Sequence, residues 1–332
     1  MIFFNRLILF STFLTFCVVV FGAYVRLTDA GLGCPDWPGC FGNLTVPESE
    51  IAIKEAQNFY PESIVEVGKA WIEMIHRYLA GVLGLSVLLI AIQSYKFRDE
   101  IQVKLVIPFG ILILVIFQAI LGMWTVTELL KPAIVTAHLM GGMTILGLLT
   151  YMSHRHIGSI SNSIIIDPSI KPIVRFSLVL LFIQIMLGGW TSTNYAALAC
   201  TDFPTCHGSY LPDMDFKNGF TIFRELGMTA SGEGLSIQAL QAIQWVHRVG
   251  AIILFVYIIY MAYLLNKYQP TRFYRNVLIL VLFIQILVGI ANLVMHLPLF
   301  LATLHNLIAA LLVIIIVIIN SSITPKYENN IY

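Results

Sequence analysis

The chain has 332 residues, of which 58% are hydrophobic and only 11% are charged, and its formal net charge at pH 7 is +1. Soluble domains carry about 25% charged residues, so a chain this poor in charge cannot cover a water-facing surface. The sequence contains no basic stripe, and a nucleic-acid partner is therefore not expected. The composition predicts a protein embedded in the lipid bilayer, without a separate soluble domain.

Apolar runs of about 20 residues, the length that crosses a hydrocarbon core of roughly 30 Å, recur along the whole chain. The first run begins after Arg6, exceeds the length of a signal-peptide core and ends at Tyr24-Val25-Arg26 without a cleavage site, so we expect a retained helix. The pattern predicts an all-α polytopic protein with eight transmembrane helices, at 6–26, 70–95, 103–127, 132–153, 173–194, 238–265, 274–295 and 299–320. The long connections are 27–69 and 195–237.

Positive charges predict the orientation of these spans. With the N-terminus inside, every short cytoplasmic connection carries Lys or Arg, whereas the short outer connections hold only Lys131. We therefore expect both termini in the cytoplasm and both long, cysteine-containing loops outside. No Arg- and Ser-rich transit peptide precedes the first span, which favours the inner membrane of a bacterium over an organelle.

The two halves of the chain repeat each other. Residues 22–42 (GAYVRLTDAGLGCPDWPGCFG) align without a gap with residues 188–208 (GGWTSTNYAALACTDFPTCHG) at an offset of 166. Further on, Ile75-His76-Arg77 matches Val246-His247-Arg248, Gln118 matches Gln285, and Ala137-His138-Leu139 matches Leu304-His305-Asn306. The repeat predicts two tandem, pseudo-symmetric four-helix bundles with the same orientation, formed by residues 1–156 and 157–332.

Four intramembrane histidines are the leading candidates for a functional site: His76, His138, His247 and His305. Each lies about 6–9 residues into an even-numbered span, roughly 10 Å below the outer hydrocarbon edge. Alternate helices of an antiparallel bundle face one another diagonally, so each half offers two imidazoles at matched depth, which suits the axial positions of a heme iron. A lone histidine could instead link two helices by a hydrogen bond, and zinc or copper would need a third ligand.

Glu73 breaks the repeat. It lies three residues before His76, on the same helical face and one turn nearer the outside, and the second half has Gln244 there. A carboxylate beside a metal centre can act as a general base or stabilise a cation, whereas an amide cannot accept a proton. The alternative is a structural ion pair between Glu73 and Arg77. The asymmetry predicts chemistry in the first half and a redox cofactor in the second.

Three arginines, Arg26, Arg77 and Arg248, lie at the outer ends of their spans. Guanidinium groups bind carboxylates bidentately, and heme propionates would lie near this level. Extension toward lipid phosphates is the alternative, and it applies most to Arg26.

Each long loop contains a cysteine pair with the same spacing, Cys34 and Cys40 in the first and Cys200 and Cys206 in the second. On the outer face of a bacterial membrane such pairs can be oxidised. A disulfide within each loop is favoured over metal binding, and a redox-active dithiol in the first loop is the alternative.

These motifs resemble those of the heme A synthase family, and the resemblance covers essentially the whole chain. It is carried by 22–28 (GAYVRLT), 31–40 (GLGCPDWPGC), 73–77 (EMIHR), Thr136-Ala137-His138, 245–248 (WVHR) and Leu304-His305-Asn306. The family belongs to cytochrome oxidase assembly and oxidises the ring-position-8 methyl of heme O to a formyl group, giving heme A.

The resemblance implies a resident heme b held by His247 and His305, with Arg248 nearby. It implies that His76 and His138 flank the substrate site, with Arg26, Arg77 and the catalytic carboxylate Glu73, and that Cys34 and Cys40 form a loop disulfide or redox pair. Candidate partners are a heme O synthase, a membrane electron donor and a second copy of the chain. The alternative function is a diheme b-type membrane electron carrier from quinol to an extracytoplasmic acceptor, which would not need the Glu73/Gln244 asymmetry.

Overall fold

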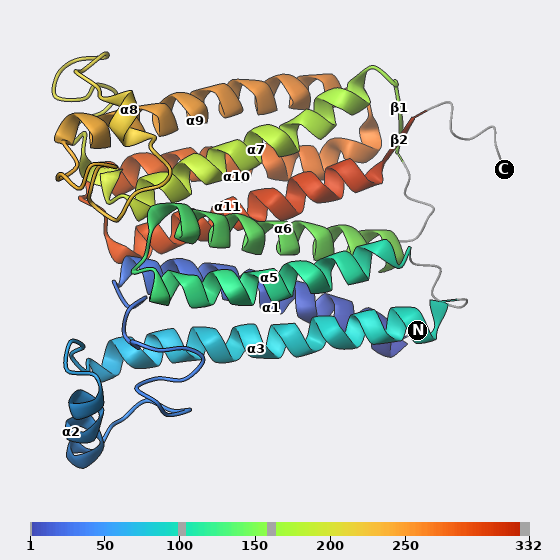
Figure 1. Cartoon of the computed structure of the whole chain (residues 1–332). Helices are drawn as coiled ribbons and strands as arrows, with labels where there is room; N and C mark the ends of the chain where they lie inside the picture. Colours follow the sequence, from blue (N-terminus) through green and yellow to red (C-terminus); the bar gives the residue numbers. More distant parts are fainter. Residues whose placement is uncertain (1, 99–103, 158–163, 326–332) are drawn as a thin grey trace.

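The computed structural model describes residues 2–98, 104–157 and 164–325. Eight of its helices are long and apolar enough to cross a membrane, and they lie side by side with nearly parallel axes (Figure 1). They are α1 (Ile2–Leu27), α3 (Val67–Lys96), α5 (Val106–Thr127), α6 (Pro132–Ile157), α7 (Ile170–Thr193), α9 (Ile237–Leu265), α10 (Arg272–Val294) and α11 (Leu299–Ser322). The predicted all-α class and the eight spans are confirmed, with ends that differ by a few residues. Residue 103, the expected start of the third span, and both chain termini lie outside the described residues.

Short elements lie beyond the ends of the long helices. The two long loops contain α2 (Glu50–Phe59), η2 (Ala196–Leu198) and α8 (Phe216–Gly219), all at one end of the stack, and η3 (Gln269–Thr271) precedes α10. Ser49 and Ser236 begin α2 and α9, because each hydroxyl accepts a backbone N–H from the first turn of its helix. At the opposite end (Figure 1), β1 (Ile164–Ile166) pairs in parallel with β2 (Ile323–Pro325), a pairing that the sequence analysis did not predict.

Helix contacts arrange the chain as two rings of four. In the first ring α1 packs on α3, α3 on α5, α5 on α6 and α6 on α1, and α7, α9, α10 and α11 repeat this order. The helices α3 and α6 therefore lie on a diagonal of the first ring, and α9 and α11 lie on a diagonal of the second ring. The halves meet where α6 packs on α7 and α11 and where α1 packs on α11. This arrangement is compatible with tandem pseudo-symmetric bundles.

The two halves share one apolar core at their junction. A cluster that is centred on α7, α9, α10 and α11 also contains Val19 from α1 and Met143 and Leu146 from α6, all buried. Burial of such side chains against both halves favours a fixed relative position of the bundles, because interiors pack at high density.

The two long loops close in the same way. Disulfides join Cys34 to Cys40 and Cys200 to Cys206, each within its own loop, as the spacing predicted. In each loop an aspartate accepts two backbone N–H groups from the residues that follow the second cysteine: Asp36 binds those of 41 and 42, and Asp202 those of 207 and 208. The glycine at the second of these positions has a positive φ, which favours a residue without a side chain.

Residues at equivalent positions of the repeat meet where the halves adjoin at the outer ends of α1 and α7. Arg26 corresponds to Ser192, and its Nη2 donates to the Ser192 carbonyl at 2.8 Å. Asp29 corresponds to Tyr195, whose hydroxyl donates to the Asp29 carboxylate at 2.7 Å. The Arg26 guanidinium also lies 4.0 Å from the centre of the Tyr195 ring. These polar contacts tie the first half to the second directly beside the cavity described next.

Candidate functional site

One large cavity of about 1870 Å³ extends through both halves of the bundle. Ligand pockets commonly measure about 300–1,000 Å³, so this space exceeds the needs of one small ligand. Its walls are mainly apolar, and the polar side chains that reach it include nearly all the predicted site residues. The lining includes Arg26, Glu73, His76, Arg77, His138, His247, Arg248 and His305.

The four histidines reach this cavity from diagonal helices, as the sequence analysis expected. His76 lies on α3 opposite α6, which carries His138, and α9 and α11 carry His247 and His305 in the same relation. Neither His76 nor His138 has a hydrogen-bond partner among the described residues, and the buried Nδ1 atoms of both are unsatisfied. Buried polar groups ordinarily have partners, so a bound ligand is the natural counterpart of these imidazoles.

Each imidazole also lies against a glycine of a neighbouring helix. In every case the nearest ring atom is Cε1, and a Cβ added to the glycine would lie between 2.9 and 3.4 Å from it. The 2.9 Å contact at Gly22 would force a shift, those at Gly188 and Gly289 would displace the ring by a few tenths of an ångström, and the 3.4 Å at Gly122 is an ordinary contact. The pairs are His76 with Gly22, His138 with Gly122, His247 with Gly188 and His305 with Gly289.

Glutamine side chains distinguish the second histidine pair. Gln184 Nε2 lies 3.0 Å from His247 Nδ1 and also donates to the His247 carbonyl at 3.0 Å. Gln285 Nε2 lies 3.2 Å from His305 Nε2. These residues were missed by the sequence analysis, although the repeat of Gln118 at Gln285 was visible. In each of these two rings one nitrogen thus has an amide partner, while the buried Nδ1 of His305 is unsatisfied, as are those of His76 and His138.

The residues present fit a heme in each half. The two imidazoles of each pair, from diagonal helices, would hold its iron, and the apolar walls suit a porphyrin face. Among the described residues, no three His, Cys, Asp or Glu side chains converge as they would around a zinc ion. The cavity, the glycine-backed rings and the two-nitrogen donor set in each half are the observations that carry this fit.

Glu73 lies at the wall of the cavity and is 4% exposed. One carboxylate oxygen accepts the Cys34 backbone N–H at 2.9 Å, and the other accepts from Arg77 at 2.5 Å. Arg77 in turn donates to the carbonyls of Asp36 and Gly39 in the same loop. The ion pair that the sequence analysis kept as an alternative is thus present, and it fastens the first disulfide loop to α3.

Gln244 makes the corresponding hydrogen bonds to the loop in the second half. Its Oε1 accepts the Cys200 N–H at 2.5 Å, and its Nε2 donates to the Ala197 carbonyl at 2.5 Å. Arg248 donates to the carbonyls of Thr205 at 2.8 Å and Cys200 at 3.1 Å. The two halves therefore share this attachment of loop to helix, and they differ in whether the attaching side chain carries a charge.

The three arginines all line the cavity and all have protein partners. Arg77 and Arg248 face their disulfide loops, whereas Arg26 contacts Asp29, Ser192 and Tyr195 where the halves meet. Their guanidinium groups bring positive charge to the outer wall of an otherwise apolar space. Anionic groups of a ligand would be stabilised at this level.

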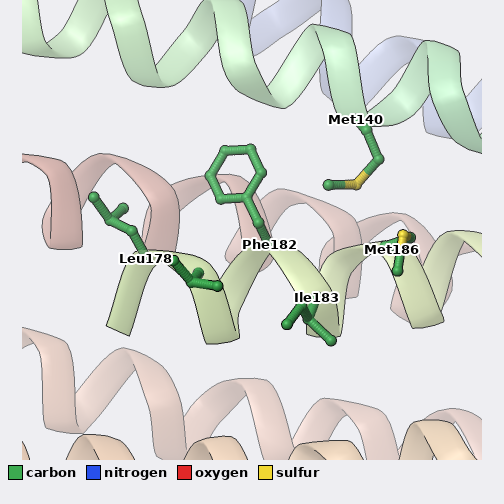
Figure 2. Close-up of a pocket in the computed structure, with 6 residues that line it drawn as sticks. Met140, Leu178, Phe182, Ile183 and Met186 are labelled. Carbon is green, nitrogen blue, oxygen red and sulfur yellow. The ribbon is translucent and has the colours of Figure 1, made fainter. Parts of the chain in front are cut away.

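A second, smaller pocket of about 380 Å³ has only apolar side chains around it. Met140 approaches it from α6, and Phe182 and Met186 project from α7 (Figure 2). Its only polar atoms are the thioether sulfurs of Met140 and Met186, and no side chain around it could transfer a proton. Its residues serve packing between the halves and contact with lipid.

These features define a class: polytopic membrane proteins whose helical bundles present paired histidines to a large, mainly apolar cavity. The profile of a family described as cytochrome oxidase assembly proteins matches residues 5–317. A heme A synthase from Shewanella oneidensis is 42% identical over 311 residues, which cover 92% of each chain. Heme A synthases from Halalkalibacterium halodurans and Bacillus cereus are 25% and 24% identical, over 89% and 87% of this chain and 88% and 83% of theirs.

The chain belongs to this family of cytochrome oxidase assembly proteins, the heme A synthases among them. The resemblance read from the sequence motifs is thereby confirmed. The matched region includes both histidine pairs and both disulfide loops. The protein is a multi-pass membrane protein with bacterial relatives.

Proposed function

We propose that this protein is a membrane heme A synthase, an oxidoreductase that converts the ring-position-8 methyl of heme O to a formyl group. Residues 1–156 form the substrate site, and residues 157–332 hold heme b as a resident cofactor for electron transfer. The observation that carries the proposal is the single cavity lined by two diagonal histidine pairs in a chain 42% identical to a heme A synthase.

Different surroundings support different roles for the two halves. His247 and His305 each have one ring nitrogen beside a glutamine amide, which restricts the orientation of the ring and favours a permanently held ligand pair, while Nδ1 of His305 is unsatisfied as in the first half. His76 and His138 have no protein partner among the described residues, which suits a site that takes up and releases its ligand. A bound heme supplies the redox-active iron, and the chain supplies orientation, charge and exclusion of water.

The remaining site residues take roles from their positions. Glu73 would hold negative charge or a proton at its carboxylate, one turn outside His76. Arg26 and Arg77 would bind substrate propionates, and Arg248 those of the cofactor. All of these side chains line the cavity. The basic residues of the short connections support an orientation with both termini in the cytoplasm of a bacterial cell and the disulfide loops outside.

A diheme electron carrier is the second candidate, and one observation favours it. Glu73 and Gln244 each accept a backbone N–H from the disulfide loop of their half and so attach that loop to its helix. The difference between the two side chains therefore does not by itself require a catalytic role for Glu73. A heme O synthase, a membrane electron donor and a second copy of the chain are candidate partners of the enzyme. A carrier would need the electron donor and an outer acceptor instead.

Identification of the hemes that co-purify with the full-length chain tests the proposal. The protein is expressed in membranes that contain heme O, purified in detergent and extracted for chromatography. Heme B together with heme O or heme A is expected, and heme A should appear in the membranes only when this chain is present. Heme B alone, with no heme A in the membranes, would identify an electron carrier.

A further inference from the structure

The cavity does not end at the same depth in the two halves. On α9 the innermost lining residue is Phe255, and on the facing part of α10 the lining ends at Leu282 and Phe283. On α3 and α5 the lining continues past the equivalent level to Leu88 and Leu112. The space in the first half is therefore longer, although both halves have the same helix arrangement.

The repeat identifies the residues that cause this difference. Gly84 and Phe255 each lie eight residues after the first histidine of their half, and Ile116 and Phe283 each lie two residues before the matched glutamines. In the second half, the rings of Phe255 and Phe283 meet edge to face with centres 5.4 Å apart. A glycine and an isoleucine replace this aromatic pair in the first half and leave its space open.

The open space forms a slot between α3 and α5. Leu88 lies four residues beyond Gly84, and Leu112 lies four residues before Ile116, so the slot runs about 6 Å further along the helices. A Cβ on Gly84 would lie 3.8 Å from the nearest atom, and one on Gly81 would have nothing within 4 Å. All the side chains that line this extension are aliphatic.

The slot also reaches the lipid-facing surface of the bundle. Leu85 and Ile116 line it and are 64% and 56% exposed, and Leu88 is 40% exposed. These positions face hydrocarbon in a membrane, so an apolar chain could lie in the slot and continue into lipid without contacting water. Toward the outer side, the slot is continuous with the space around His76 and His138.

We propose that this slot holds the isoprenoid side chain of the substrate, and that the Phe255–Phe283 pair excludes such a chain from the second half. The proposal rests on the proposed function, because heme O carries a long isoprenoid chain that protoheme lacks. The slot selects a tailed heme for the His76/His138 site. The aromatic pair selects a tail-less heme for the His247/His305 site. One pair of positions in each half thereby determines which heme each site accepts.

The test builds the aromatic pair into the first half. Full-length wild-type protein and a Gly84→Phe/Ile116→Phe variant, both retaining the resident heme, are titrated with heme O and separately with protoheme, and binding is followed by absorbance. We expect the variant to bind heme O about tenfold more weakly or worse, with protoheme binding unchanged within about twofold. Gly110→Phe is the matched control, because Gly110 lies on α5 outside the cavity with nothing within 4 Å of its Cβ position.

A second variant keeps the test decisive if the double variant does not fold. Gly81→Ile places a side chain in the slot at the position equivalent to Ile252, and it should weaken heme O binding in the same selective way. Equal weakening of both hemes, or no change in either, would overturn the slot assignment. A membrane lipid that stays bound to wild-type protein after saturation with heme O, and is lost from the variants, would overturn it as well.

The same titrations separate this proposal from the proposed function. Wild-type protein that binds heme O and protoheme equally, yet still converts heme O, overturns the slot and leaves the function intact. Wild-type protein that binds neither heme in its first half overturns both. Selective loss of heme O binding in the slot variants supports both.

Discussion

Replacement of Glu73 by Gln separates the catalytic role of this side chain from its structural one. The amide Oε1 can still accept the Cys34 N–H, because Gln244 makes the corresponding bond to Cys200 at 2.5 Å. The replacement loses only the negative charge and the 2.5 Å ion pair with Arg77. Arg77 keeps the loop carbonyls of Asp36 and Gly39 as acceptors. The fold of the outer loop should therefore survive.

The two roles predict effects of different kinds. A hydrogen bond to a charged group contributes about 1.5–3 kcal/mol, which bounds the expected loss of stability. A positioned acid–base group contributes about 10²–10⁴-fold to the rate. If Glu73 is catalytic, the variant should keep heme b and lose almost all conversion of heme O. If Glu73 only fastens the loop, conversion should stay near normal while the thermal midpoint falls.

The assay is the ratio of heme O to heme A in membranes that contain the variant, measured with its heme b content and its thermal midpoint. Abundant heme A would refute the catalytic role, and loss of heme b would mean that the residue is structural. The matched control is Gln244→Glu, which places a carboxylate beside Arg248 in the second half. This control should leave conversion nearly unchanged, because the substrate lies in the other half.

Three further predictions concern the histidines, the loops and the glycines. His247→Ala should abolish the resident heme b, because one imidazole cannot replace two, and an unchanged reduced-minus-oxidised spectrum would contradict this. Loss of the Cys34–Cys40 disulfide, which joins residues six apart, should lower the stability of the fold by about 2–3 kcal/mol and loosen this loop without unfolding the bundle. Free thiols at both cysteines in unreduced peptides would contradict the cross-link itself. Gly188→Ala should displace the His247 ring and alter the electron paramagnetic resonance spectrum or potential of heme b, whereas Gly110→Ala should not; equal effects of the two would refute the role of the glycine.

The architecture could be predicted because the bilayer imposes it. Each span needs about 20 apolar residues, so hydropathy located all eight helices. The gap-free repeat then indicated how four helices form a unit, and the contacts place α3 opposite α6 and α9 opposite α11 as expected. The pairing of β1 with β2 was not predictable, because three-residue strands joined across 159 positions leave no local pattern (Ile164 with Ile323).

Candidate site residues with chemistry that is rare inside a membrane could be found from the sequence, whereas residues that act through the shape of the fold could not. A histidine inside a membrane is conspicuous, because an unpartnered polar group there is costly. The glycines beside the rings are ordinary in transmembrane helices, and only their repetition, of Gly22 at Gly188 and of Gly122 at Gly289, distinguishes them. The pairing of Glu73 with Arg77 was kept as an alternative, but its bond to the Cys34 N–H escaped prediction, because which loop N–H groups lie over a helix depends on the fold of the loop.

The contacts between equivalent positions at the outer junction have a consequence for how such a protein can be assembled. If two identical halves formed a symmetric dimer, Arg26 of one half would face Arg26 of the other, and Asp29 would face Asp29. Both pairs of like charges would repel each other. Joining the halves in one chain removes this restriction. Each copy can then change separately, so that a serine stands where a second arginine would face Arg26, and Asp29 meets the Tyr195 hydroxyl. Covalent fusion thus permits complementary partners at this junction, and it permits the two proposed sites to differ in the ligand that they bind.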